Sequence, residues 1–261
     1  MNAGAPEPSG IVDGPLRLCL DDVTDDPALD TAMSRAILQR VDAGELPPTL
    51  RLSRPARVLA FSARDARAGG FDTAVAAARA AGFTPVLRLA GGRAAVFTPD
   101  TIAFAWAVPT VIPAEAIEAR FALMASALRT AFATVGVDAR VGEVPGEYCP
   151  GSWSVNAGGR RKLAGVGQRL LRRAAHTGGV VVVDGAEAIN AVLTPVHAAM
   201  GLPWDPAATG AVADEVPGVA WTTMRDAIVG AFADRVGLEP WSLDAATRTR
   251  AETLAADHRI P

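Results

Sequence analysis

A cysteine and a lysine thirteen positions apart are the residues of this chain whose types and spacing could do chemistry. Cys149 lies in the segment 147–151, and Lys162 is the only lysine among the 261 residues. A thiolate is a strong nucleophile, and a neighbouring ammonium favours the thiolate form of a cysteine. An ammonium is also a compact point charge, whereas the guanidinium of arginine is a planar fork. The pair therefore predicts covalent catalysis at Cys149 beside Lys162; the alternative is a surface lysine with no chemical role.

The two cysteines of the chain have different sequence surroundings. Two cysteines in a chain of this length do not make a disulfide framework, which predicts a reducing compartment, the cytoplasm. Cys19 lies in the alternating segment 16–20, where a free cysteine usually packs as a small hydrophobic side chain. Cys149 precedes Pro150-Gly151, so we expect an extended backbone at Cys149 and a turn directly after it. A thiol at such a turn can be exposed to a substrate.

A hairpin should position the lysine. Residues 153–157 and 162–166 are predicted to be strands joined by Gly158-Gly159, so that Lys162 pairs near Val155. At about 3.3 Å per residue, a straight strand would leave Cys149 about 20 Å from that pairing point. The turn at Pro150 must therefore fold Cys149 back toward Lys162.

Glycines also interrupt the segment Arg88–Phe97. The pair Gly91-Gly92 between two predicted strands permits a sharp backbone path and close approach to a ligand. The alternative is an ordinary hairpin turn. The segment is not a phosphate loop, because no Gly-Lys-Ser/Thr follows it.

Composition excludes several classes of protein. Half of the residues are apolar, the net charge is −3 and the arginines are scattered, which predicts a globular chain that does not bind nucleic acid. No apolar run approaches the roughly 20 residues that span a bilayer, and no spacing of Cys and His fits a metal. Met1–Pro15 lacks the features of a signal peptide, so we expect a flexible, cytoplasmic N-terminus followed by one domain over residues 16–261.

The remaining pattern alternates between strands and helices. Asp26 is a candidate N-cap for a helix that ends near Val41, and Pro113 is a favoured first residue for the longest helix. Strands are predicted at 49–52, 57–61, 84–89 and 180–183, and further helices at 71–81, 186–200, 223–236 and 244–258. This mixture predicts an α+β domain with a mixed sheet flanked by helices.

Three motifs in order resemble those of the biotin/lipoate protein ligase and octanoyltransferase superfamily. They are Arg88–Phe97, Tyr148-Cys149-Pro150-Gly151 and the segment 159–169, and the resemblance extends over roughly residues 16–204. It implies an α+β catalytic domain akin to the biotin ligases and the class II aminoacyl-tRNA synthetase core.

The resemblance also implies roles for particular residues. The Cys-Pro-Gly segment is most similar to transferases that move octanoyl from the glycine-cleavage H protein to lipoyl domains through a cysteine thioester. By this resemblance Cys149 forms the thioester, and Lys162 contacts the acyl carbonyl and keeps the sulfur ionised. Backbone N–H groups near Gly165 are candidates for the oxyanion site. The acyl-binding residues expected are Arg88, Gly91, Gly92, Ala164, Gly165 and His176, although a lone histidine such as His176 is more often structural.

The substrate and partners follow from the same resemblance. We expect an octanoyl or lipoyl group as substrate and no tightly bound cofactor, with ATP needed only by a ligase. The expected partners are lipoyl domains of 2-oxoacid dehydrogenases or the glycine-cleavage H protein, and an acyl carrier protein is a further candidate donor.

Two departures bear on the choice within the superfamily. Many lipoate ligases and octanoyl-carrier transferases have a third glycine and then a histidine after the Gly pair, where this chain has Arg93 and then Phe97 or Thr98. The transferases with a Cys-Pro-Gly segment lack that histidine as well. The helices after Trp221 are also too few for the accessory domain of many ATP-dependent ligases. Both features favour the cysteine-dependent transferase; an ATP-dependent lipoate ligase and a non-catalytic acyl- or carrier-binding protein remain the alternatives.

Overall fold

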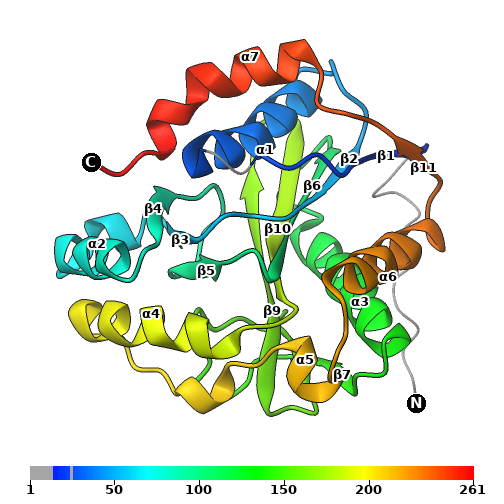
Figure 1. The fold of residues 1–261 in the computed structure, drawn as a ribbon. Helices are drawn as coiled ribbons and strands as arrows, with labels where there is room; N and C mark the ends of the chain where they lie inside the picture. The colour runs from blue at the N-terminus through cyan, green and yellow to red at the C-terminus, as the bar shows by residue number, and fades with distance from the viewer. Residues whose placement is uncertain (1–13, 24–25) are drawn as a thin grey trace.

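A computed structural model of the chain describes residues 14–23 and 26–261 (Figure 1). The predicted flexible N-terminus, Met1–Pro15, lies outside the described residues except for Gly14 and Pro15. The described part contains two sheets and the helices that cover them, which confirms the predicted α+β class.

The larger sheet has eight strands among the described residues, in the order β11-β1-β2-β6-β10-β9-β8-β7. Strand β1 pairs in parallel with β11 and β2, and every other neighbouring pair is antiparallel. The strands are β1 (Leu16–Cys19), β2 (Thr49–Ser53), β6 (Thr101–Pro109), β7 (Ala139–Val141), β8 (Val155–Ala157), β9 (Arg161–Leu170), β10 (Ala174–Val182) and β11 (Leu238–Pro240).

The smaller sheet explains the path of the glycine pair. Strand β3 (Val58–Phe61) lies between β4 (Thr84–Leu87), which is parallel to it, and β5 (Ala95–Phe97), which is antiparallel. Strands β4 and β5 are therefore on opposite edges of β3. The segment 88–94, which contains Gly91-Gly92, crosses from one edge to the other, so the alternative of an ordinary hairpin turn is wrong.

The helices pack in pairs around the two sheets, with α2 and α4 against the smaller one. Figure 1 shows α1 with α7 at the top, α2 with α4 on one side, and α3 with α6 on the other. The α-helices are α1 (Pro27–Asp42), α2 (Phe71–Ala80), α3 (Ile117–Thr134), α4 (Ala186–Met200), α5 (Val212–Glu215), α6 (Trp221–Ala233) and α7 (Ala245–Leu254), and the 3₁₀ turns are Asp65–Arg67, Pro206–Ala208 and Ala255–His258. Asp26 caps α1 as predicted, because its carboxylate accepts the N–H groups of Ala28 and Leu29.

Several predicted boundaries differ from those in the structure, and two of the predicted starts are wrong by four residues or more. Helix α3 begins at Ile117 rather than at Pro113, because the carbonyl of Pro113 accepts the Arg120 guanidinium instead of a helical amide. Strand β10 begins at Ala174 rather than at Val180. Its Gly178-Gly179 pair has low strand propensity, but the sheet pairs it with β6 on one side and β9 on the other.

The two faces of the large sheet carry side chains of different size. Along β6, Phe104 and Trp106 belong to a core that includes α3 and α6. The alternate residues Ala103, Ala105 and Ala107 face the other way, because successive strand residues point to opposite faces. Helix α1 and the smaller sheet cover this second face, which leaves a narrow space above the alanines.

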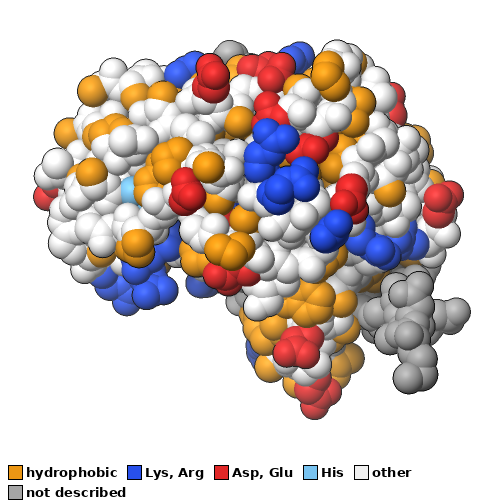
Figure 2. Space-filling model, turned by 90° about the horizontal axis from the view of Figure 1, so that it is seen from below, with side chains coloured by type: hydrophobic (Ala, Val, Ile, Leu, Met, Phe, Trp, Pro, Cys, Tyr) orange, Lys and Arg blue, Asp and Glu red, His pale blue; other side chains and the backbone are white. Residues whose placement is uncertain are grey.

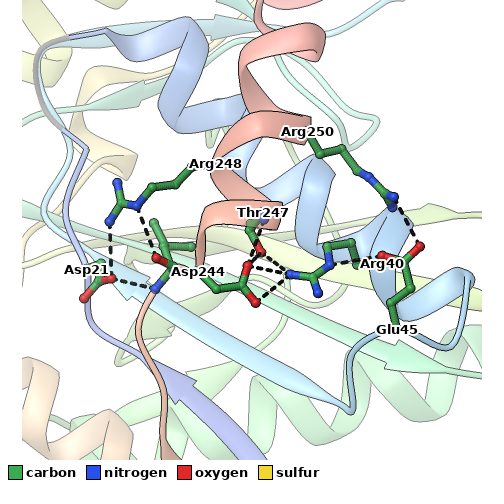
Figure 3. A network of polar contacts seen from close by, with 8 residues as sticks. Asp21, Arg40, Glu45, Asp244, Thr247, Arg248 and Arg250 are labelled. Carbon is green, nitrogen blue, oxygen red and sulfur yellow. Dashed lines mark hydrogen bonds and ion pairs between the residues drawn. The ribbon is translucent and has the colours of Figure 1, made fainter.

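The C-terminal segment is part of the same body. Strand β11 extends the large sheet, and α7 packs on α1. Figure 3 shows that Arg40 of α1 donates to Asp244 and Thr247, while Glu45 accepts from both Arg40 and Arg250.

The outer surface carries charges of both signs. On the face seen in Figure 2, basic and acidic side chains alternate with apolar ones. No helix among the described residues is both long enough and apolar enough to cross a membrane.

Candidate active site

The thiol of Cys149 faces hydrogen-bond donors. Its Sγ accepts the N–H of Arg93 at 3.1 Å, and the Arg88 guanidinium lies 3.6 Å away. Cys149 has a φ of 44° and is the only described residue other than glycine with a positive φ. A left-handed backbone at such a residue costs free energy, and residues held in this way cluster at functional sites. The expected extended conformation is therefore wrong, because contacts to the sulfur and the carbonyl of Cys149 outweigh the local effect of Pro150.

Lys162 contacts the backbone of the segment 142–154, which joins β7 to β8, carries Cys149 and is called the cysteine loop below. Its Nζ donates to the carbonyl oxygens of Tyr148 (3.0 Å) and Cys149 (2.7 Å), and to Oε1 of Glu147 (3.0 Å). The predicted hairpin is present, with Lys162 opposite Asn156, the neighbour of Val155. The cation that contacts the sulfur, however, is Arg88. The three donor hydrogens of Lys162 are all used within the loop.

Glu147 was not predicted as a site residue, yet it connects the whole loop. Its side chain is fully buried, and besides Lys162 its carboxylate accepts Ser154 Oγ (2.6 Å) and the N–H groups of Gly151 (3.1 Å) and Val144 (3.0 Å). These contacts lie on both sides of Cys149 in the sequence. An acidic residue two positions before the cysteine, in a chain with one lysine, was the signal that could have identified the pair.

The phenol of Tyr148 lies beside the same pair. Its ring centroid is 5.0 Å from Lys162 Nζ. Burial, with the nearby Cys149 and Glu147, raises the pKa of Tyr148 well above its ordinary value. The side chain therefore stays neutral and adds no negative charge next to the thiol.

The glycine pair lets the backbone approach the thiol. Gly92 has a φ of 101°, and a Cβ at this position would lie 2.8 Å from Cys149 Sγ and 2.6 Å from the Arg88 guanidinium. The following residue, Arg93, is anchored by an ion pair with buried Asp65 (3.3 Å). A side chain at position 92 would displace the groups that contact the sulfur.

One cavity of about 490 Å³ brings most of the predicted residues together. It is lined by Cys149 and Lys162 and by the predicted acyl-binding residues Arg88, Gly91, Gly92 and Gly165. Its volume lies in the range of small-ligand sites. Cys149, which is partly buried, thus lies at the wall of this cavity.

Ala164 does not line this cavity. The pairing of β8 with β9 is irregular between Val155 and Asn156. Lys162 and Gly165 consequently lie together, with 3.3 Å between the Lys162 Cε and an ideal Cβ at Gly165, whereas Ala164 packs in the core on the opposite face. Its expected place in the acyl pocket is not what the structure shows.

A trough floored by residues with little or no side chain lies along the large sheet next to the site. Gly167 of β9 pairs with Gly178 of β10, which pairs with Ala105 of β6. At about 4.8 Å between strands, this row covers about 10 Å. A second cavity of about 100 Å³ lies over its far part and is lined by Ala105, Gly178 and His176. Arg88, Phe97 and Gly179 line both cavities, so the two are adjacent.

The site thus combines a nucleophile with a long narrow space. The described residues contain no cluster of three or more His, Cys, Asp or Glu side chains that could hold a metal ion. A thiol faced by two donors at the mouth of a trough of small residues suits covalent transfer of an extended, largely apolar group.

Comparisons with known proteins agree with this description. The family model of the lipoyl protein ligase A/B catalytic domain matches residues 26–202. An octanoyl-(GcvH):protein N-octanoyltransferase of Geobacillus kaustophilus is 32% identical over 171 residues, which cover 62% of this chain and 57% of that protein. A lipoyl-(GcvH):protein N-lipoyltransferase of Listeria monocytogenes is 24% identical over 67% of this chain and 64% of its own length. The matched part thus spans less than two thirds of these relatives.

Solved structures show the same fold. Lipoate-protein ligase A bound with ATP superimposes with a TM-score of 0.76 at 17% identity, covering 93% of this chain and 94% of the ligase. The putative lipoate protein ligase Ta0514 of T. acidophilum with bound lipoic acid gives a TM-score of 0.73 at 18% identity, covering 92% and 94%. The expected ligase-like fold is therefore confirmed.

Proposed function

The chain belongs to the lipoyl protein ligase A/B catalytic domain family, and on that basis we propose that it is an acyltransferase that moves an octanoyl or lipoyl group through a thioester on Cys149 onto a lysine of a carrier domain. The observation that carries this proposal is Cys149, which lines the cavity and whose thiol contacts the N–H of Arg93 and the guanidinium of Arg88. The names of the two curated relatives support the choice of acyl group and of transfer chemistry.

The proposed reaction is an exchange between two amides. The Cys149 sulfur attacks the carbonyl carbon of an acyl-lysine amide, the C–N bond breaks, and the thiol proton leaves with the donor lysine amine. The amine of an acceptor lysine then attacks the thioester, the C–S bond breaks, and one amine proton returns to the sulfur. One amide is broken and one is formed, so the exchange needs no ATP and no tightly bound cofactor.

The residues around the thiol have distinct parts in this proposal. Arg88 and the Arg93 N–H stabilise the thiolate and lie closest to the oxyanion that develops next to it. They replace the N–H groups near Gly165 that the sequence suggested. Lys162 and Glu147 hold the loop so that the sulfur points at these donors.

The proposed partners are carrier domains with an acylated or free lysine. The glycine-cleavage H protein is the first candidate donor, because the names of the two curated relatives contain GcvH. Lipoyl domains of 2-oxoacid dehydrogenases are the candidate acceptors. An acyl carrier protein is a further candidate donor, from which the first step would be an exchange of thioesters instead of the cleavage of an amide. We place the protein in the cytoplasm as part of the same proposal, since the reaction requires Cys149 as a free thiol.

Intact-protein mass spectrometry tests the proposal. The purified protein is mixed in turn with octanoyl-H protein, octanoyl-acyl carrier protein, and lipoate with ATP. We expect the mass of one octanoyl group on the wild type with a carrier donor and none on Cys149→Ser. Cys19→Ser is the matched control, because Cys19 is the other free thiol and is fully buried away from the cavity. It should acylate like the wild type.

The alternatives give different results in the same experiment. An ATP-dependent ligase would consume ATP with lipoate and would tolerate Cys149→Ser. A binding protein would be stabilised by an acyl ligand without any change of mass. Either result would contradict the transferase proposal.

A further inference from the structure

The far end of the trough is polar. The row of small residues Gly167, Gly178 and Ala105 continues on the next strand to Arg51, which pairs with Ala105. Arg51 forms an ion pair at 2.5 Å with Asp30 of α1, and both line the second cavity. Ser34, one turn further along α1, lies at 3.5 Å from the same guanidinium and lines the cavity as well. An acyl chain that follows the trough therefore ends against charged and hydroxyl groups.

His176 adds an unpartnered imidazole to this end. Its side chain is buried, with 5% of the residue exposed, and it lines the cavity. Its Nε2 lies 2.4 Å from the position that a Cβ would take at Gly178, so the glycine leaves the space that the ring occupies beside the trough. Nδ1 has no hydrogen-bond partner among the described residues. Burial lowers the pKa of His176 to about 4, so near neutral pH the ring carries one N–H donor and one acceptor nitrogen.

Two arginine nitrogens at this cavity are also buried without a hydrogen-bond partner. The Nε atoms of Arg51 and Arg88 are buried and have no partner among the described residues, and both side chains line the cavity. Buried polar groups are almost always hydrogen-bonded, to protein, water or ligand. Three unpartnered buried groups around one small cavity therefore indicate that a polar atom belongs there when the site is filled.

From these contacts we propose that the cavity selects acyl groups that carry a hydrogen-bond acceptor at the end far from the carbonyl, over unsubstituted chains of the same length. The inference rests on the proposed function, because it assumes that the acyl group enters from Cys149. An acceptor satisfies the donors of the cavity, whereas a terminal methyl group displaces water from them and offers nothing in return. The ring disulfide of a lipoyl group and a terminal hydroxyl group share this chemistry.

Equilibrium binding separates this inference from the proposed function. The dissociation constants of octanoate, 8-hydroxyoctanoate and lipoate are measured with Cys149→Ser, which has no thiol at that position to form a thioester. We expect the better of the two acceptor-bearing acids to bind at least about tenfold more tightly than octanoate, because sites built to hydrogen-bond a substrate discriminate strongly against analogues that lack the group. The hydroxyl and disulfide acids tell which acceptor the cavity prefers.

A variant pair then locates the effect. In the Cys149→Ser background, His176→Leu should reduce the ratio of the two dissociation constants, octanoate over the better acceptor-bearing acid, from about ten to about one. The main cause should be tighter binding of octanoate. His197→Leu is the matched control: His197 is also buried with unpartnered ring nitrogens, but it lies on α4 and lines neither cavity. It should keep the difference.

Two results would overturn the inference. The first is that octanoate binds as tightly as both other acids, which needs no variant to observe. The second is that the difference persists in His176→Leu. Failure of the proposed function would be seen separately, as the absence of any acyl mass on the wild-type protein.

Discussion

Two networks in this molecule are each organised around one cation, and they differ in what the cation contacts. Lys162 and Glu147 have 2% and 0% of their side chains exposed, and the donors of Lys162 go to one carboxylate and two backbone carbonyls of the cysteine loop. Arg40 is also largely buried, but its partners Asp244 and Glu45 are 40% and 42% exposed, and they come from other elements of the fold (Figure 3).

The difference indicates that the two networks have separate roles. The Lys162 network fixes the backbone on either side of a nucleophile that has an unfavourable φ, so its effect is on geometry. The Arg40 network connects α1 to the cap of α7 and leaves the cavity untouched, so its effect is on stability. Variants can test whether activity and stability separate in this way.

The largest effect is expected from the buried pair. Glu147→Gln and Lys162→Met should each lower acyl-enzyme formation about 100-fold, because small displacements of a reacting group cost about that factor. Each should also lower the free energy of unfolding by about 3 kcal/mol, since a lone buried charge remains. The double variant should recover much of the stability but none of the activity. A double-mutant cycle with both readouts measures this, and additive losses of stability would contradict the coupling.

Replacement of the lysine by arginine sharpens the same point. Lys162→Arg keeps the charge, but three acceptors converge on one compact ammonium, and a planar guanidinium cannot match them. We expect a loss of roughly 30-fold in acylation rate, between that of the wild type and that of Lys162→Met. The matched control is Arg161→Lys, next to it in β9 but paired with Glu215 at the surface. Wild-type rates in Lys162→Arg would show that charge alone is sufficient.

A third change touches neither network. Ala105→Leu places a larger side chain in the trough, and we expect octanoyl transfer to fall at least about tenfold, because the cavity there is small. Acetyl transfer to Cys149 from the same donor should be unaffected, since a short group does not reach Ala105. Equal losses of octanoyl and acetyl transfer would show that the acyl chain does not lie along the trough at Ala105.

The Arg40 network should affect stability and leave activity unchanged. Asp244→Ala removes the N-cap of α7 and a partner of Arg40, with an expected loss of about 1 kcal/mol in the free energy of unfolding because solvent screens this partly exposed group. The hydrogen bond from Arg40 lowers the pKa of Asp244 to about 2. Its contribution is therefore present above the unfolded pKa of about 4 and is lost as the pH falls toward 2. Urea unfolding against pH should show a flatter acid limb in the variant, and a change in acylation rate would contradict the separation.

The smallest effect is expected at the surface. Arg140 pairs with Asp138 at 2.7 Å, and both side chains are more than half exposed. Such pairs contribute little to stability. Arg140→Ala should therefore change neither the unfolding transition nor the acylation rate, and it serves as the baseline for the other variants.

The sequence was sufficient to bring together Cys149, Lys162 and the glycine pair Gly91-Gly92, which line one cavity. Local rules predicted part of the structure around them. A Gly-Gly turn brings Lys162 opposite Asn156, and the cap at Asp26 and the alternation of β1 follow from neighbouring residues alone. The three motifs, in their order along the sequence, were sufficient to predict the family and the fold.

What the sequence could not predict depends on long-range contacts. The φ of Cys149 is set by Lys162 and Arg93, which lie 13 and 56 residues away, and the local preference of a residue before proline points the other way. Ala164 lies outside the acyl site because the pairing between β8 and β9 is irregular. The amino-acid composition of these strands does not predict such an irregularity. Glu147 and the polar end of the trough likewise need the fold to bring separate elements together.

A single-turnover chase tests the central claim most directly. Wild-type protein carrying one octanoyl group on Cys149 is isolated from its donor and mixed, without nucleotide, with a carrier domain that has a free lysine. We predict that the octanoyl mass disappears from the enzyme and appears on that lysine. An octanoyl group that stays on the enzyme, or that moves only when ATP is added, would contradict the account.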